Sequence, residues 1–341
     1  MPPVSLTGTV QSETDPHTGD FSVIKSFGDN RELSLLFGQH DEHLKIIEQQ
    51  LQVVITPRGN KLAIRGSKAA CENALTVLDN LVNRISNQLD VTAGDVKGAI
   101  RMSLDTAPEN KPERIIQIKT HRKVISPRSP GQAKYISAIA DNELVFGTGP
   151  AGTGKSYLAV ACAAQGLLEG RIERIIFSRP AVEAGENLGF LPGDMKEKVD
   201  PYLRPLYDAL YDVMPHVKVE QYIADGTIEI APLAFMRGRT LSSSFIILDE
   251  AQNTTQQQMK MFLTRLGEGS RMIVNGDPSQ VDLPDKVVSG LSHATGLLEK
   301  VKGIAHITLT EKDIVRHPLV SRIVGAYDRE YHRDKTTGKK N

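Results

Sequence analysis

Residues 147–156 read GTGPAGTGKS. Gly149 is followed by four residues and then by Gly154-Lys155-Ser156, which fits the pattern G-x-x-x-x-G-K-[ST] of loops that hold nucleotide phosphates. The run NELVFG (142–147) before it predicts a strand, and SYLAVACAAQGLLEG (156–170) after it predicts a helix. Strand, glycine-rich loop and helix form the context that this motif requires.

The loop and the start of its helix are therefore the predicted phosphate-binding residues. Backbone N–H groups in such a loop, together with the N-terminus of the helix, face negative charge. We expect Lys155 to reach the β- and γ-phosphates and Ser156 to bind Mg²⁺. The residues predicted to contact the nucleotide here are Gly149, Pro150, Ala151, Gly152, Thr153, Gly154, Lys155, Ser156 and Tyr157.

A pair of acids follows a second apolar run, SFIILDEAQN (244–253). Asp249 lies where a carboxylate would organise Mg²⁺, because ligands of open α/β sheets collect at the carboxyl ends of strands. The adjacent Glu250 is placed to polarise an attacking water. The alternative is a pair of solvated carboxylates at a helix start, which the apolar run directly before them disfavours. A water-activating Glu250 favours hydrolysis over transfer to a small-molecule acceptor and so disfavours a metabolic phosphotransferase.

A third run, RMIVNGDPSQVDLP (271–284), predicts another strand that ends in Gly276-Asp277, with Gln280 three residues farther on. Gln280 is placed to contact the γ-phosphate or its attacking water. From spacing alone, an ordinary turn with a surface glutamine explains the pattern equally well.

Composition limits the classes of protein to which the chain can belong. The chain has 341 residues, enough for two domains, and its 41 Lys plus Arg balance 41 Asp plus Glu. Bulk charge therefore gives no argument for nucleic-acid binding, and only local patches count. The two cysteines, Cys71 and Cys162, are typical of buried thiols. Because no run is apolar for long enough to span a bilayer and the N-terminus does not resemble a signal peptide, we expect a cytoplasmic protein without membrane contact.

Pattern changes along the chain predict its organisation. We expect a flexible tail over 1–20, a small α+β domain over 21–104, a Pro-rich linker over 105–118, an α/β domain over 119–331 and a basic tail over 332–341. In the small domain RELSLLF (31–37) predicts a strand, DEHLKIIEQQL (41–51) a helix, QVVITPRGNKLAIRG (52–66) two strands, and Ser67 a helix cap.

In the larger domain six apolar runs between helices predict a parallel sheet covered on both faces. They are ELVFG, RIIFS, TIEIAP, FIILD, RMIVNG and IAHITL. The stretch IIQIKTHRKVISPRSP (115–130) contains four cations and no acid, and is the clearest local basic segment.

Five segments together resemble the PhoH-like family of bacterial ATPases, from about residue 120 to about 327. They are FGTGPAGTGKSYLAVA, SRPAVEAGENLGFLPGDMKEKVDPYLRPLYDAL, FMRGRTLSSSFIILDEAQN, NGDPSQVDLP and DIVRHPLVSRIV. The family's catalytic domain is similar to the first motor domain of superfamily 1 helicases, which implies a RecA-like P-loop fold. By that likeness LDEAQ matches the acidic motif and GDPSQ the following glutamine motif, which supports Gln280. The resemblance also implies ATP as cofactor with Mg²⁺, with Gln132 reading the adenine edge and Tyr135 supporting the base.

The small domain resembles the KH-like domain of the family members that lack a nuclease domain. KH domains clamp nucleotides with a G-x-x-G loop. Here the matching stretch is GQHD, in which Gly38 is present and Asp41 replaces the second glycine. A carboxylate there repels phosphate. We therefore expect this domain to have the KH-like shape, but the resemblance does not imply that this loop binds phosphate. The alternative is a KH-like fold used only for packing or oligomer contacts.

Superfamily 1 helicases have a second motor domain that supplies an arginine to the γ-phosphate, and no second set of strands follows residue 331. We therefore expect an arginine from a neighbouring subunit and a homo-oligomeric ring, most simply a hexamer. The candidates are Arg316 and Arg265 first, then Arg237 and Arg239. In the loop 179–199, Arg179 and Lys196 are candidate nucleic-acid contacts.

The sequence thus predicts an ATPase in RNA metabolism, either RNA-dependent or a helicase-like motor. The resemblance implies an endoribonuclease or ribosomal partner in ribosomal RNA maturation. The alternative is a nucleotide-controlled switch or adaptor with slow hydrolysis and no unwinding.

Overall fold

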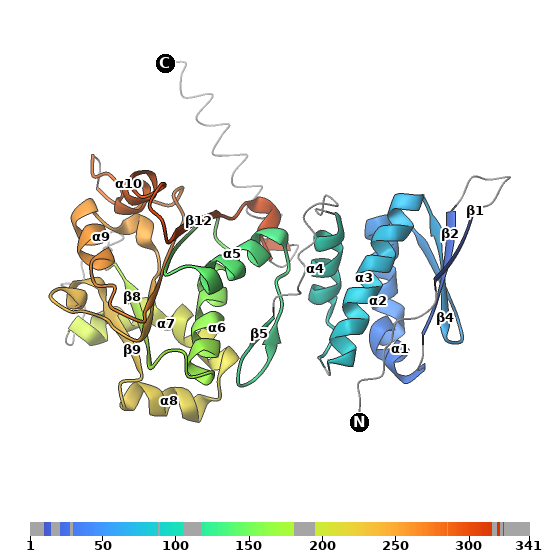
Figure 1. Ribbon diagram of the computed structural model, residues 1–341, viewed down its shortest axis with the longest axis horizontal. Coiled ribbons are helices and arrows are strands. Elements are labelled where there is room, and N and C mark those ends of the chain that lie inside the picture. Colours follow the sequence, from blue (N-terminus) through green and yellow to red (C-terminus); the bar gives the residue numbers. More distant parts are fainter. Residues whose placement is uncertain are drawn as a thin grey trace, which may run out of the picture. The chain divides into compact units, whose positions relative to one another are not determined.

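The structure is a computed structural model that describes residues 10–14, 21–27, 30–87, 89–104, 117–180, 195–284, 286–315, 319–320 and 323. The chain divides into two compact units, Met1–Ser137 and Ala138–Asn341 (Figure 1). Their boundary falls inside helix α5 (Pro130–Asp141). The domain limits drawn from sequence composition stay a prediction. Among the helices described, none combines the length and apolar character needed to cross a membrane.

The described part of the first unit contains a four-stranded antiparallel sheet and, besides the start of α5, four α-helices. The sheet order is β1 (Val10–Thr14), β2 (Phe21–Ser26), β4 (Lys61–Gly66) and β3 (Val54–Arg58). The helices are α1 (Asn30–Phe37), α2 (Glu42–Leu51), α3 (Lys68–Ser86) and α4 (Ala93–Leu104). As predicted, Ser67 caps α3, since its side chain accepts a hydrogen bond from the backbone N–H of Ala70.

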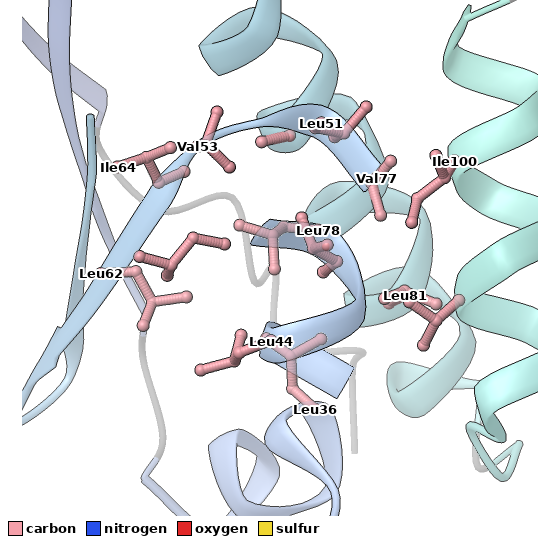
Figure 2. Close-up of a cluster of buried hydrophobic side chains, with 14 of the residues drawn as sticks. Leu36, Leu44, Leu51, Val53, Leu62, Ile64, Val77, Leu78, Leu81 and Ile100 are labelled. Atoms are coloured by element: carbon pink, nitrogen blue, oxygen red, sulfur yellow. The ribbon is translucent and has the colours of Figure 1, made fainter. Parts of the chain in front are cut away.

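One face of this sheet forms a core with the helices. Leu62 and Ile64 of β4 are fully buried, while Lys61 before them and Arg65 after them are exposed and Ala63 between them is half-buried. This is the alternation expected of a strand with one buried face. Figure 2 shows Leu62 and Ile64 of the strand on the same side as Leu78 of α3 and Leu44 of α2, and all four belong to one core cluster. The apolar spacing of the sequence therefore builds the core of this unit.

The strand predicted over 31–37 is wrong, because these residues form helix α1. Leu33 and Leu36 are buried at helical spacing, while Leu35 between them is 59% exposed. The expected flexible tail over 1–20 is also corrected, since Val10–Thr14 forms strand β1 and pairs with β2.

With this correction the GQHD stretch lies between two helices, α1 and α2. Gly38 has a φ of 71°, and a Cβ there would lie 2.9 Å from the ring of His43. Only glycine fits such a position without displacement. His40 and Asp41 also have positive φ, at 52° and 59°. The turn is thus a strained connection that delivers Asp41 to the start of α2.

The basic segment 115–130 is less isolated than its sequence indicates. It forms a short hairpin of β5 (Ile118–Lys119) and β6 (Val124–Ile125). Beyond the hairpin, the guanidinium of Arg128 lies 3.7 Å from a carboxylate oxygen of Asp95 on α4. The same oxygen lies 3.5 Å from Arg84 on α3. An acid distant in sequence therefore offsets part of the segment's charge.

The second unit is built on a six-stranded parallel sheet. Its order is β12 (Ile304–Thr308), β7 (Leu144–Thr148), β11 (Arg271–Gly276), β10 (Ser244–Leu248), β8 (Arg174–Arg179) and β9 (Ile228–Pro232). Every neighbouring pair is parallel. All six strands predicted from the sequence are present, so the α/β class with a parallel P-loop sheet is confirmed.

Helices cover both faces of this sheet. On one face α6 (Lys155–Leu168) packs against β8, β10 and β11, and α7 (Met195–Val213) and α8 (His216–Ala224) contact β9. The opposite face holds α9 (Gln256–Leu263), as Figure 1 shows, and α10 (Gly290–Leu297), which packs against α9. Phe146, Ile246 and Val274 of three strands are buried with Met259 and Phe262 of α9.

The strand order fixes which loops meet. Because β11 lies between β7 and β10, the loop after β11 lies between the glycine-rich loop and the acid pair. The carboxyl ends of parallel strands share one edge of the sheet, so these three loops converge there.

Candidate nucleotide-binding site

The glycine-rich loop joins β7 to α6 and depends on its glycines. Gly149, Gly152 and Gly154 have φ values of 140°, 82° and 84°. A Cβ on Gly149 would lie 2.2 Å from the carbonyl oxygen of Leu309, which is backbone and cannot move aside easily. The loop therefore curls tightly around the N-terminus of α6, and its first glycine is required by a close approach of backbone.

The ammonium group of Lys155 lies inside this loop. Its Nζ donates to the carbonyl oxygens of Gly149 at 2.6 Å and Pro150 at 2.9 Å, and to Oγ1 of Thr153 at 3.3 Å. The side chain is largely buried, which places its charge inside the glycine-rich loop. A bound phosphate oxygen would take the place of one or more of these neutral acceptors.

Ser156 and Asp249 meet across two elements. The Ser156 hydroxyl at the start of α6 donates to Oδ1 of Asp249 at 2.7 Å. Burial raises the pKa of the Asp249 carboxyl, and the nearby charge of Glu250 raises it further, while the hydrogen bond from Ser156 lowers it. A buried carboxylate whose charge is disfavoured by burial is well suited to receive a cation.

These two residues fit a Mg²⁺ ion held together with phosphates. Mg²⁺ prefers hard oxygen ligands and is bound in nucleotide sites by one or two protein groups, substrate phosphates and water. The hydroxyl of Ser156 and the carboxylate of Asp249 are such a pair. Within the described part of the chain, no group of three or more His, Cys, Asp or Glu is arranged to hold a metal by itself.

Glu250 has a strained backbone conformation, and two side chains contact its carboxylate. Its φ is 53°, in the left-handed region that non-glycine residues avoid. Its Oε2 accepts a hydrogen bond from Nε2 of Gln252 at 2.6 Å, and its Oε1 lies 3.4 Å from Nη2 of Arg179. The buried Gln252 also accepts from the backbone N–H of Asp277 at 3.0 Å. One amide thus joins the acid pair to the loop after β11.

A pocket of about 220 Å³ opens where the three loops meet. Its lining comes from the glycine-rich loop, the acid pair and the loop after β11. The lining residues are Ala151, Gly152, Gly154, Lys155, Ser156, Tyr157, Asp249, Glu250, Gly276, Asp277 and Gln280. A pocket that combines a buried ammonium, a glycine-rich loop and two carboxylates is suited to a polyphosphate with a divalent cation.

Comparisons with known proteins identify the family. The family model described as PhoH-like protein matches residues 124–328. The PhoH-like protein of Bacillus subtilis (strain 168) is 50% identical over 298 residues, which cover 86% of this chain and 93% of that protein. The chain belongs to the PhoH-like family.

Further matches agree with this assignment. The PhoH-like protein of Mycobacterium tuberculosis (strain ATCC 25618 / H37Rv) is 48% identical over 296 residues, covering 86% of this chain and 84% of that protein. A solved structure, the Sulfolobus solfataricus SWI2/SNF2 ATPase core in complex with dsDNA, aligns with 57% of this chain and 47% of its own. Its TM-score of 0.35 and identity of 13% are too low to indicate function.

In this PhoH-like protein the pocket brings together most residues that the sequence singled out. Gly149, Pro150 and Thr153 are not in the lining, but they shape the loop and hold Lys155. Tyr157 lines the pocket and donates its hydroxyl to Asp212 of α7 at 2.7 Å. Gln280 lies at the exposed rim, with its backbone N–H bonded to the carbonyl of Asp277. Their roles toward a nucleotide stay predictions.

The residues predicted to recognise adenine belong to the first compact unit. Gln132 is buried, and its Oε1 accepts from the backbone N–H of Arg128 at 2.7 Å. The side chain of Tyr135 is fully buried and so presents no ring face to solvent. Neither observation tests the predicted recognition of adenine.

The candidate arginines differ in their surroundings. Arg265 donates to the carbonyls of Met261 and Arg239, which ties the end of α9 to the preceding loop. Arg239 makes a two-point pair with Glu229, at 2.6 and 2.7 Å. Both arrangements favour structural roles within the chain, and Arg237 is exposed. Arg316 lies outside the described residues, as do residues 181–194 of the predicted loop, whereas Lys196 belongs to helix α7.

Sequence reasoning missed the contacts of three residues at the site. The sequence pattern assigns no role to Asp277 or Gln252, and it gives no sign that Arg179, a predicted nucleic-acid contact, also pairs with Glu250. The recurrence of an acid directly after a buried strand, as at Asp249, is the signal that would have found Asp277.

Proposed function

We propose that this PhoH-like protein binds ATP with Mg²⁺ and hydrolyses it in the pocket at the carboxyl edge of the parallel sheet. The observation that carries the proposal is the 2.7 Å contact of Ser156 with Asp249 beside Lys155 and Glu250 in one pocket. These four side chains supply charge for the phosphates, oxygens for the cation and a carboxylate for the water.

Each residue has a distinct task in this proposal. The ammonium of Lys155 leaves its loop carbonyls and neutralises charge on the phosphates. Ser156 and Asp249 would hold Mg²⁺, which when bound supplies charge neutralisation on the phosphate oxygens. Glu250 orients the attacking water and accepts its proton, and Gln252 and Arg179 fix the direction of the Glu250 carboxylate.

Phosphate release by the purified full chain tests this proposal. With Mg²⁺ and ATP we expect steady release, and with EDTA no release. GTP in the same assay tests the preference for adenine that the sequence resemblance implies. Equal rates with and without Mg²⁺ would contradict the site as assigned.

We further propose that the nucleotide cycle acts on RNA. One support is the order of elements in the first unit: β2, α1, the GQHD turn, α2, β3, β4 and α3. It agrees with the KH-like resemblance of the sequence, in which a turn between two helices contacts nucleotides. The other support is a set of cations on the sheet of this unit. Arg58 and Lys61 face each other across the β3–β4 pair, and both are exposed with Arg65 nearby. Like charges directly opposite on a sheet lower its stability, so a polyanionic partner would explain their retention.

Single-stranded RNA titrated against the labelled full chain at two salt concentrations tests this part. We expect binding that weakens with salt and a rate of ATP hydrolysis that rises with RNA. Rates that stay flat over all RNA concentrations would remove the RNA-driven motor. Unwinding of duplex RNA, an endoribonuclease partner and a ribosomal partner are finer proposals that rest on the sequence resemblance, and a strand-separation assay and co-purification address them.

A nucleotide-controlled switch is the second candidate. It is favoured by the contacts of Gln252 and Arg179 with Glu250, which occupy both carboxylate oxygens of the residue assigned to the water. Tight nucleotide binding with slow turnover that RNA does not change would support the switch over the motor.

We also propose a homo-oligomeric ring, as a hexamer, in which Arg316 reaches the site of a neighbouring subunit. Sedimentation velocity measures the size. A sharper test mixes two inactive variants, Lys155→Ala and Arg316→Ala. If the arginine acts between subunits, mixing restores part of the activity, and if it acts within one chain, the mixture stays inactive.

A further inference from the structure

Asp277 directly follows strand β11 and has one carboxylate oxygen in use and one without a partner. Its Oδ1 accepts from the backbone N–H of Ser279 at 3.0 Å and from the Ser279 hydroxyl at 2.6 Å. Its Oδ2 is buried and makes no hydrogen bond with any described residue. The whole residue is only 6% exposed.

A buried carboxylate oxygen without a partner requires a physical explanation. Leaving a buried polar atom unpaired costs about 1–3 kcal/mol, and more for a charged group. The turn that follows β11 does not need this oxygen, because both bonds from Ser279 end on Oδ1. An asparagine would accept the same two bonds without a buried charge. The second oxygen of Asp277 is therefore retained for something other than the turn.

The position of Asp277 indicates what that is. Asp277 lines the same pocket as Lys155, Ser156 and Asp249. Because β11 lies between β7 and β10, its carboxyl end lies between the glycine-rich loop and the acid pair. The backbone N–H of Asp277 is fixed by Gln252, whose amide also holds Glu250. Asp277 is thus placed beside the two residues that fit Mg²⁺ and is held in register with Glu250.

We propose that Oδ2 of Asp277 accepts a hydrogen bond from a water of hydration of the nucleotide's Mg²⁺, which makes Asp277 a positioning residue for the ion. The inference rests on the proposed function, because it assumes a nucleotide with Mg²⁺ in this pocket. Mg²⁺ releases its waters reluctantly and keeps several of them in protein sites. Those waters need acceptors, and outer carboxylates that receive such bonds orient the ion and raise its affinity.

The test measures metal affinity rather than turnover. Mn²⁺ replaces Mg²⁺ as a paramagnetic probe, and electron paramagnetic resonance measures its binding to the full chain with a non-hydrolysable ATP analogue. Asp277→Asn keeps the acceptor for Ser279 but places an amide N–H₂ at Oδ2. We expect Mn²⁺ affinity to fall about 10–100-fold, the usual effect of removing an outer partner of a metal site.

Two variants separate the metal from the turn and from net charge. Asp282→Asn makes the same charge change in the same loop, but Asp282 is exposed and does not line the pocket. Ser279→Ala removes the hydroxyl bond to Oδ1 and leaves Oδ2 unchanged. Both are expected to bind Mn²⁺ as the wild type does.

The outcomes are distinct. If Asp277→Asn binds Mn²⁺ within twofold of wild type, or if Ser279→Ala weakens binding equally, Asp277 serves only the turn and the inference is wrong. If the wild-type chain itself binds no Mn²⁺ with the analogue, the proposed nucleotide site fails, and this inference fails with it. A loss confined to Asp277→Asn, with a thermal unfolding midpoint no lower than that of wild type, supports the assignment.

Discussion

Asp249 offers a prediction in which stability and function change in opposite directions. The residue is 6% exposed, and burial is the largest cause that raises the pKa of its carboxyl above the ordinary value of 3.8. We predict that Asp249→Asn unfolds at a higher temperature than wild type in the nucleotide-free state, while it loses Mg²⁺-dependent nucleotide binding.

The sign follows from linkage between ionisation and folding. Because the pKa of Asp249 is higher in the folded than in the unfolded protein, folding favours the neutral acid. Stability is therefore greatest below the unfolded pKa and falls as pH rises through the folded pKa, where the cost of the buried charge is fully present. Asparagine has no such charge and still accepts the bond from Ser156. The advantage of the variant should be absent below about pH 4 and should grow as pH rises through the folded pKa of Asp249.

The expected size is modest but measurable. Relief of an unfavourable group kept for function commonly yields about 0.5–2 kcal/mol. For a unit of about 150–250 residues, 1 kcal/mol shifts the unfolding midpoint by about 2–4 °C. Differential scanning calorimetry of the nucleotide-free chain between pH 4 and pH 8, in EDTA, measures this shift.

Asp225 supplies a control of opposite sign. It is exposed, and hydrogen bonds from Thr227 lower the pKa of its carboxyl, so its contribution to stability is present at pH 7 and lost as pH falls. Asp225→Asn should therefore unfold slightly earlier than wild type at pH 7. A variant at Asp249 that is less stable than wild type at pH 7, or a difference that does not change with pH, would refute the reasoning about its burial.

Three further predictions concern the general base Glu250, the glycine-rich loop and the GQHD turn. Glu250→Gln should keep nucleotide binding and lose about 10²–10⁴-fold in turnover, as removal of a general base does; normal phosphate release would assign the base elsewhere. Gly149→Ala should abolish binding of a fluorescent nucleotide and cost about 1–3 kcal/mol, because its Cβ meets the carbonyl of Leu309 at 2.2 Å; normal binding and midpoint would contradict the loop geometry. Asp41→Gly should raise RNA affinity several-fold at low salt, by removing about 1 kcal/mol of charge repulsion; Asp41→Asn separates charge from shape, and unchanged affinity in both would exclude this turn from the RNA contact.

The site was the most predictable part of the molecule. The glycine-rich loop, the acid pair and the loop after β11 each follow an apolar strand, and parallel strands bring such ends to one edge. Spacing and strand pattern alone therefore predicted that Lys155, Ser156 and Asp249 would meet. No distance between these side chains had to be known in advance, because a parallel sheet brings the ends of its neighbouring strands together.

In the first unit the spacing of apolar residues was not enough to predict every helix and strand. RELSLLF contains closely spaced leucines that suit a strand or a helix, and a seven-residue window cannot separate the two periods. The contacts of Leu33 and Leu36 with the rest of the core decide for a helix, and those contacts come from residues far along the chain. Strand β1 depends in the same way on its pairing with β2.

Contacts between individual side chains were the other feature that the sequence did not predict. Sequence spacing placed Arg179 in a loop and gave no sign of its contact with Glu250, 71 positions later. The two bonds of Gln252 and the unpaired oxygen of Asp277 likewise depend on strand order and on single rotamers. These are the features from which the proposals on regulation and metal positioning arise.

The central claim is that the pocket at Lys155 and Asp249 hydrolyses a nucleotide. Phosphate release from Mg²⁺-ATP by the full chain, compared with Lys155→Ala and with the exposed-lysine control Lys260→Ala, tests it most directly. We expect release by wild type and Lys260→Ala, and none above background by Lys155→Ala. Equal release by Lys155→Ala and wild type would contradict it.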